Sequence, residues 1–174
     1  MIIDSHCHLT YEPMSNALNE TIDRANKDGI KYMLTISTED KSFEQILKIV
    51  NGYESVYGTY GIHPHEAKSH QHIQSDDIIN KVNQNKKIIG IGETGLDFYY
   101  NHSEKKDQIY SFEEHITAAQ KKNLPLIVHT RSAEKETLQI LEKHSKKKET
   151  KILIHCFTGS REFAFKLLDL GAYI

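Results

Sequence analysis

Short apolar runs alternate with longer stretches of helical spacing along the whole 174-residue chain. The runs lie at residues 2–3, 32–36, 56–62, 88–91, 126–128, 152–154 and 172–174. Between them, Leu18, Ile22 and Ala25 recur on one helical face, and Gly29 is expected to end that helix in a left-handed conformation. A longer apolar stripe spans residues 109–119. Strands that are apolar on both faces, each followed by a helix, predict a parallel sheet covered by helices.

The number of strand–helix units narrows the fold class. We count six units and a seventh strand that starts at Gly171, whereas a (β/α)₈ barrel has eight units in typically about 250 residues. No linker or low-complexity segment divides the sequence. We therefore predict an α/β fold in which residues 1–174 form one domain, an incomplete TIM (β/α)₈ barrel that lacks the last barrel strands. An open doubly wound sheet is the alternative.

Composition and charge exclude several classes of protein. Apolar residues make up 38% and charged residues 26%, which is typical of a globular chain and not of a disordered one. The formal net charge is -2, so any contact with nucleic acid is expected at a local site and not over a broad basic face. The only strong basic run, Lys146 to Lys148, is expected to be a solvated face.

The expected compartment follows from what the sequence lacks. The first residues form no signal peptide, and no stretch approaches the roughly 18 apolar residues of a membrane span. Two cysteines, Cys7 and Cys156, make no disulfide framework, and we expect both to be small buried side chains directed towards the helices. The sequence thus indicates a cytoplasmic protein with no membrane contact and no obligate protein partner.

Histidines and one glutamate follow five of the predicted strands. They are His6 and His8, His63 and His65, Glu93, His129, and His155. The carboxyl ends of parallel barrel strands meet at one mouth, and residues two apart on a strand, such as His6 and His8, point to the same side. Several imidazoles with one carboxylate suit one or two divalent metal ions. We therefore predict a metal site made of His6, His8, Glu93, His129 and His155, although a lone His129 or His155 would more often be a buried core histidine.

Other residues at the predicted mouth have two interpretations each. His63 and His65 are expected to contact a substrate phosphate, or to pack a loop around Pro64. Arg131 follows His129 by two and is expected to hold a phosphate bidentately, or to form a salt bridge at the rim. Asp97 orients a ligand imidazole or caps a loop. The remaining histidines, to which no role is assigned, are expected away from the mouth: His70, His72, His102, His115 and His144.

Five segments carry a family resemblance. They read DSHCHL at 4–9, GIHPH at 61–65, GIGETGLD at 90–97, PLIVHTR at 125–131 and HCFTG at 155–159. In this order they resemble the successive signatures of the TatD family of metal-dependent deoxyribonucleases. The resemblance implies a TIM barrel, dependence on divalent metal, and hydrolysis of DNA phosphodiester bonds, often from the 3′ end. It makes His6 and His8 ligands of a first ion, Glu93 the bridging catalytic carboxylate, and His129 and His155 ligands of a second ion.

One part of the family pattern is absent. Members of the family carry an aspartate near a Thr-Asp-x-Pro motif on the last barrel strand, which helps bind metal and handles the proton of the attacking water. This sequence reaches Ile174 without that motif. We therefore expect a fragment, a frame-shifted gene product or a naturally short protein, and a catalytically defective product is one hypothesis for the chain.

The predicted activity is that of a deoxyribonuclease with DNA as its substrate and two divalent ions as cofactors. Two ions bridged by Glu93 would bring the pKa of a shared water towards neutrality. The histidines favour Zn²⁺ or Mn²⁺, whereas the resemblance points to Mg²⁺. The alternative is an amidohydrolase or a small-molecule phosphoesterase, since the same barrel can serve either chemistry. The stretch at residues 92–97 speaks against an amidohydrolase, which usually places a carboxylated lysine at that strand.

Overall fold

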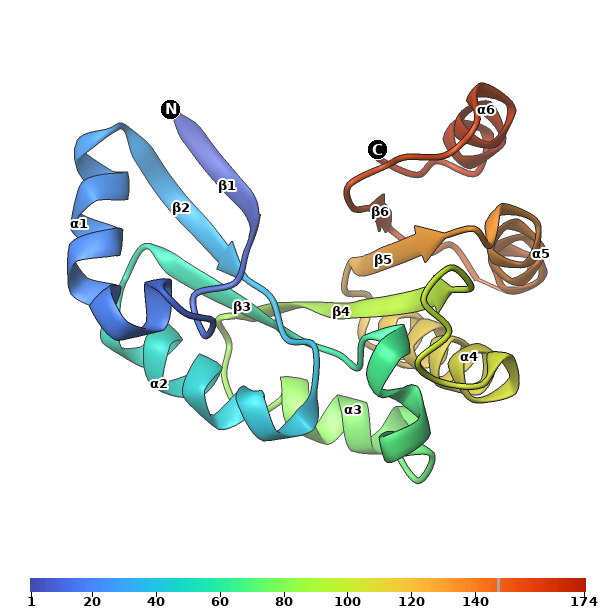
Figure 1. The fold of residues 1–174 in the computed structure, drawn as a ribbon, viewed down its shortest axis with the longest axis horizontal. Coiled ribbons are helices and arrows are strands. Elements are labelled where there is room, and N and C mark those ends of the chain that lie inside the picture. Colours follow the sequence, from blue (N-terminus) through green and yellow to red (C-terminus); the bar gives the residue numbers. More distant parts are fainter. Residues whose placement is uncertain (147) are drawn as a thin grey trace.

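The computed structural model describes residues 1–146 and 148–174, so Lys147 of the basic run lies outside the described residues. Six parallel strands form one sheet in chain order. They are β1 (Ile2–Cys7), β2 (Ile30–Thr35), β3 (Val56–Tyr60), β4 (Ile88–Asp97), β5 (Leu126–Arg131) and β6 (Ile152–Ile154). Figure 1 shows a curled sheet with β1 and β6 on facing sides of an opening. Because the strand order never reverses, the sheet is a partial barrel and not a doubly wound sheet.

Helices cover the outer side of the curled sheet (Figure 1). They are α1 (Leu18–Lys27), α2 (Phe43–Gly52), α3 (Ser75–Val82), α4 (Lys105–Lys122), α5 (Glu134–Ser145) and α6 (Arg161–Asp169). Three short 3₁₀ helices, η1 (Met14–Ala17), η2 (Asp40–Ser42) and η3 (Pro64–His70), lie in connecting segments. Gly29 follows α1 with a φ of 90°, which confirms the left-handed helix end predicted there. Among the described residues, no helix combines the length and the hydropathy that crossing a bilayer requires.

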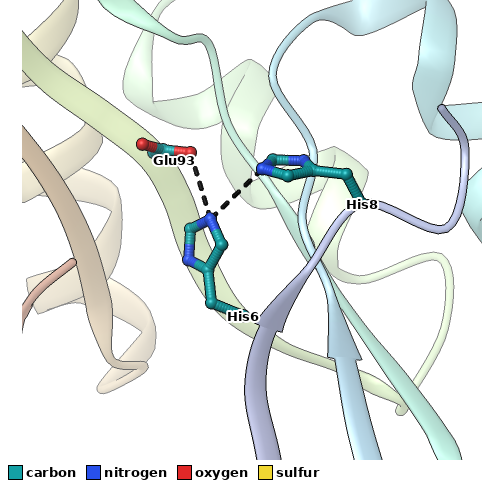
Figure 2. A group of neighbouring side chains, drawn as sticks. All are labelled: His6, His8 and Glu93. Carbon is teal, nitrogen blue, oxygen red and sulfur yellow. Dashed lines mark hydrogen bonds and ion pairs between the residues drawn. The ribbon is translucent and has the colours of Figure 1, made fainter. Parts of the chain in front are cut away.

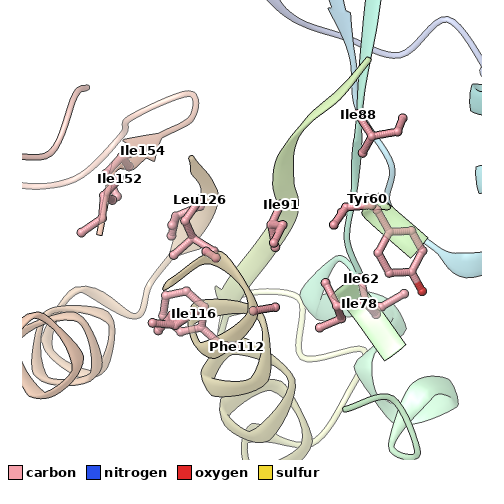
Figure 3. Packing of buried hydrophobic residues seen from close by; sticks show 14 of the residues in the cluster. Tyr60, Ile62, Ile78, Ile88, Ile91, Phe112, Ile116, Leu126, Ile152 and Ile154 are labelled. Atoms are coloured by element: carbon pink, nitrogen blue, oxygen red, sulfur yellow. The ribbon is translucent and has the colours of Figure 1, made fainter. Parts of the chain in front are cut away.

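The core lies between the sheet and these helices. Figure 3 shows Phe112 and Ile116 of α4 beside Leu126 of β5 and Ile91 of β4, and all four side chains are fully buried. Burial of each such side chain contributes roughly 1.5–3 kcal/mol. The longest helix is therefore fixed to the two strands that carry Glu93 and His129.

The two edges of the sheet differ. At the β6 edge, Tyr173 donates from its backbone N–H to Ile152 O and accepts from Ile154 N–H, each at 2.9 Å, as expected of the start of a seventh strand. At the other edge, β1 pairs with β2 alone in the part of the chain that the structure describes. Ile2 and Ile3 are consequently more than half exposed, at 56% and 55%.

Strand β4 is longer than the apolar run at residues 88–91 predicts, because it continues to Asp97. Its pairing with β5 shifts register between Ile91 and Thr94, where three residues of β4 are matched by two of β5. This irregularity is a β-bulge, which redirects side chains and increases the local twist of a strand. The bulge falls at Gly92 and Glu93, so the strand carries the glutamate within its length and not at its end.

Candidate metal centre

The backbone around Gly92 directs Glu93 towards the centre of the barrel mouth. Gly92 has a φ of 134°, a conformation that residues with a Cβ atom rarely adopt. A Cβ atom at Gly61, on the segment after β3, would lie only 2.4 Å from Gly92 Cα, so the two backbones can approach this closely only because residue 61 is glycine. The Glu93 N–H donates to Ser37 O at 2.9 Å, and the residue is only 3% exposed.

One group of donor atoms joins β1 to β4. Figure 2 shows His6, His8 and Glu93 pointing towards one another. His6 Nε2 lies 3.3 Å from His8 Nε2 and 3.4 Å from Glu93 Oε2. Two imidazole nitrogens that face each other repel unless a proton or a cation lies between them. The ligand atoms of all three residues lie within 4.8 Å of one another, which fits a divalent ion held by imidazole and carboxylate.

A second group faces the other oxygen of Glu93. His129 Nδ1 lies 3.2 Å from Glu93 Oε1, and His63 Nε2 lies 3.8 Å from the same atom. The two oxygens of one carboxylate thus face two different sets of imidazoles, as a bridging carboxylate between two ions would.

His63 differs from His129 in its hydrogen bonds. His63 Nδ1 accepts from the backbone N–H of His65 at 3.2 Å, so the neutral ring carries its proton on Nε2 and is a donor towards Glu93. His129 Nε2 instead donates to Asp97 Oδ2 at 3.1 Å, which leaves Nδ1, the atom directed at Glu93, free to exchange its proton for a metal ion. His129 therefore suits a metal ligand, whereas His63 suits a donor to an anionic oxygen, the role expected from its position.

His155 follows β6 at the same mouth but lies in neither group. Its ring stacks on that of His6, with centroids 3.3 Å apart and planes 8° from parallel. The four residues His6, His8, Glu93 and His129 are brought together as the sequence predicts. A role for His155 as a ligand of the second ion remains a prediction.

The imidazoles around the Glu93 anion differ in how readily they take up a proton. Burial lowers the pKa of His63 to about 3, and burial together with His6 lowers that of His155 to about 4. Burial opposes ionisation of Glu93, yet hydrogen bonds from His129 and His6 hold its pKa below the ordinary range. The pKa of His129 is raised, because Glu93 and Asp97 outweigh the opposing effect of burial. A cation that enters beside His129 must therefore displace a proton, so metal affinity should rise with pH.

Asp97 fulfils both roles that the sequence leaves open. Its Oδ2 accepts from His129 Nε2 at 3.1 Å and from His65 Nε2 at 2.9 Å. Its Oδ1 accepts from the backbone N–H groups of Tyr99 and Tyr100 at 3.0 and 2.9 Å. The side chain is fully buried, and one carboxylate thus orients a candidate ligand and caps the loop after β4.

Two of the three residues expected to bind substrate, His63 and His65, line an open cleft of about 380 Å³. Its lining includes His63, His65, Glu93, His129 and His155. Arg131 is outside this lining, at the end of β5, with Cζ 4.3 Å from the Tyr99 ring centroid and 4.7 Å from that of Tyr100. No ion pair joins Arg131 to a carboxylate among the described residues, so the predicted salt bridge is absent there.

The expectations for Cys156 and His102 are wrong, and the expectation for Cys7 holds only in part. Cys156 is exposed and not buried, because it has a φ of 46° in the turn after the short strand β6. Cys7 is half-buried, with its Sγ donating to Leu34 O. His102 lies at the mouth, with its ring 4.6 Å from that of His65. His115, to which the sequence assigns no role, holds the segment that carries His63.

His115 links α4 to the end of β3. The ring is fully buried, accepts from the Ile62 N–H through Nε2 at 3.0 Å, and donates from Nδ1 to Ser111 O at 2.7 Å. The two residues are 53 positions apart, so local spacing does not predict this bond. The one sign of it in the sequence is a histidine within an apolar helical stripe. His63 is the next residue after Ile62 and is positioned by this bond.

A pH dependence of stability follows from His115. Burial lowers its folded-state pKa to about 4 from about 6.5, so the unfolded chain binds the proton more tightly. The contribution of neutral His115 to the free energy of unfolding is complete above pH 6.5 and is lost as pH falls towards 4. Urea unfolding should show the wild type losing about 3 kcal/mol more than His115→Gln between pH 7 and pH 4. Parallel pH profiles for the two proteins would contradict this assignment.

Comparisons with known proteins agree with the fold. An uncharacterised metal-dependent hydrolase of Buchnera aphidicola is 37% identical, with 99% of this chain and 68% of the relative covered. The 3'-5' ssDNA/RNA exonuclease TatD of Salmonella typhimurium is 32% identical, with 99% and 66% covered. The crystal structure of YJJV, a TatD homologue from Escherichia coli, superposes with a TM-score of 0.83 at 26% identity over 98% of this chain and 66% of that one. The chain thus spans about two thirds of the length of these proteins.

Fold and relatives together define a metal-dependent hydrolase built on a TIM-barrel-like sheet. The model of the family described as TatD related DNase matches residues 3–174. The chain belongs to this family.

Proposed function

We propose that the chain is part of a nuclease that hydrolyses phosphodiester bonds of single-stranded DNA from the 3′ end, with two divalent ions, Mg²⁺, Mn²⁺ or Zn²⁺. The observation that carries the proposal is the position of Glu93 between two sets of imidazoles. The name of the Salmonella relative supports the substrate and the direction of cleavage. The proposed activity is that of a complete barrel. Residues 1–174 form the part of that barrel that carries this site.

The proposed ligands divide between the two oxygens of Glu93. His6 and His8 would hold one ion with Oε2, and His129 and His155 would hold the other with Oε1. Bound divalent ions supply charge that stabilises the developing negative oxygens and lowers the pKa of a coordinated water. Residues of the chain bind the substrate and donate or accept the hydrogen bonds that the reaction needs.

Residues around the ligands have separate tasks in the proposed reaction. His63 Nε2 carries a proton and donates it in a hydrogen bond to a phosphate oxygen, because its Nδ1 already accepts from the His65 N–H. Asp97 keeps Nδ1 of His129 directed into the site, because it accepts from Nε2 of the same ring. His65 lines the cleft and Arg131 ends β5, and this imidazole and guanidinium can hold the next phosphate of the strand.

The test measures release of nucleotides from 3′-labelled single-stranded DNA with Mg²⁺ or Mn²⁺. It uses the 174-residue chain and a chimera in which the last third of a relative's barrel follows residue 174. We expect EDTA to abolish cleavage. We also expect the chimera to be faster, since acid–base assistance from the added barrel end is typically worth about 10²- to 10⁴-fold.

Parallel assays distinguish a nuclease from an amidohydrolase or a small-molecule phosphoesterase. Single-stranded RNA, a phosphodiester without bases, and acyl and amide substrates are incubated under the same conditions. If DNA and RNA stay intact while an acyl or amide bond is cleaved, the nuclease proposal is wrong.

A further inference from the structure

An exposed aromatic cluster lies beside the metal site, on the loop that follows β4. We propose that this aromatic platform, made of Tyr99, Tyr100 and His102 with Arg131 against it, stacks an unpaired base of a single-stranded nucleic acid. The inference rests on the proposed nuclease function and specifies how the same site would recognise its substrate.

The rings form one continuous surface. Tyr99 and Tyr100 are perpendicular, with centroids 4.9 Å apart, and Tyr100 is nearly parallel to His102 at 5.8 Å. The Arg131 guanidinium lies 4.3 and 4.7 Å from the two tyrosine centroids. Tyr99 is 62% exposed and Tyr100 is 49% exposed, so about half or more of each residue lies outside the core. Ring faces in contact with water are free to stack on a planar base.

His65 joins the platform to the metal site. Its ring lies 4.6 Å from His102 and 5.5 Å from Tyr100 on one side. On the other side it lies 4.4 Å from His63 and 6.3 Å from His129. A row of rings thus leads from the candidate ligands to the surface, along which a nucleotide chain could lie with a phosphate at the metal site.

Backbone hydrogen bonds, and not ring contacts, fix the position of the platform. Asp97 accepts hydrogen bonds from the N–H groups of Tyr99 and Tyr100, and the same carboxylate orients His129. Binding therefore costs little ordering of the loop, and the platform keeps a defined position relative to the candidate ligand. Replacing a platform side chain leaves these backbone bonds in place.

Charge favours stacking as the main source of affinity. Glu39, Glu66 and Glu93 line the cleft, and the chain has no excess of positive charge with which to hold a phosphate backbone. Aromatic stacking tolerates any base, because every base offers a planar face. Arg131 forms no ion pair with a carboxylate among the described residues, so its N–H groups can hold a phosphate while Cζ stays close to both tyrosine rings.

The test measures binding of the 174-residue chain to a single-stranded oligonucleotide that carries 2-aminopurine, a base whose fluorescence falls when it stacks, at its 3′ end. A matching oligonucleotide has an abasic 3′ nucleotide and a distant dye for anisotropy. The proteins are the wild type, Tyr100→Leu, Tyr100→Phe and Tyr32→Leu. Tyr32 lies near the amino end of β2, away from the mouth, and its exposure of 44% matches that of Tyr100.

We expect wild type, Tyr100→Phe and Tyr32→Leu to quench the 2-aminopurine. Tyr100→Leu should bind about tenfold more weakly without quenching, and the abasic strand should bind all four proteins equally weakly. The proposed platform is wrong if the wild type binds the 2-aminopurine strand and the abasic strand equally well. It is also wrong if Tyr100→Leu binds as tightly as wild type, or if no protein binds at all. Stacking without cleavage of any nucleic acid would leave the platform standing and reject the nuclease proposal.

Discussion

Replacing Glu93 with glutamine should lower phosphodiester hydrolysis by about 10³-fold or more, because metal ions contribute several kcal/mol to stabilising the transition state. The amide keeps the size of the side chain but removes the charge that both sets of imidazoles face. Initial rates with the 3′-labelled DNA substrate, at saturating Mn²⁺, measure the effect in the chimera described above.

Glu39 provides the matched control for this substitution. It lines the same cleft, and its ion pair is with Lys41, at 2.9 Å, outside the imidazole cluster. Glu39→Gln removes the same charge from the same cleft and should retain activity within a few-fold of wild type. Equal losses in the two variants would show that general charge in the cleft, and not a bridging carboxylate, supports the reaction.

Substituting alanine for Gly92 should destabilise the protein by about 3 kcal/mol or more. The new Cβ atom would lie 2.4 Å from Ile127 O, and the φ of 134° is unfavourable for any residue other than glycine. Since Gly92 directs Glu93, metal binding should weaken together with stability. Urea unfolding measures the first effect, and a Mn²⁺ titration followed by calorimetry measures the second.

Gly52 is the control for the substitution at Gly92. It ends α2, and nothing lies within 4 Å of a Cβ atom built on it. Gly52→Ala should be neutral or slightly stabilising, by about 0.4–1 kcal/mol. If Gly92→Ala unfolds at the same urea concentration as wild type, the backbone described around Glu93 is incorrect.

The sequence predicts the strands and the residues at their ends because both depend on local pattern. Apolar runs separated by amphipathic stretches specify parallel strand–helix units, and the carboxyl ends of such strands share one side of the sheet. This reasoning places His6, His8 and His129 at one mouth, where the structure has them. It also anticipates the start of a seventh strand, which the backbone bonds of Tyr173 confirm.

What the sequence does not predict depends on backbone geometry and on distant contacts. The bulge at Gly92 lets β4 continue to Asp97, and this continuation brings Asp97 within reach of His129. No periodicity distinguishes a bulge from a strand end. His115 and His102 acquire their contacts from residues far along the chain, so local spacing gives no sign of them.

The central claim is that Glu93 joins two sets of imidazoles into one site for two divalent ions. Elemental analysis after exposure to Mn²⁺ and dialysis tests it most directly, on wild type, Glu93→Ala and Glu39→Gln. The account predicts two ions per chain in wild type and in Glu39→Gln, and loss of metal from both positions in Glu93→Ala. Metal content that is the same in Glu93→Ala as in wild type would contradict it.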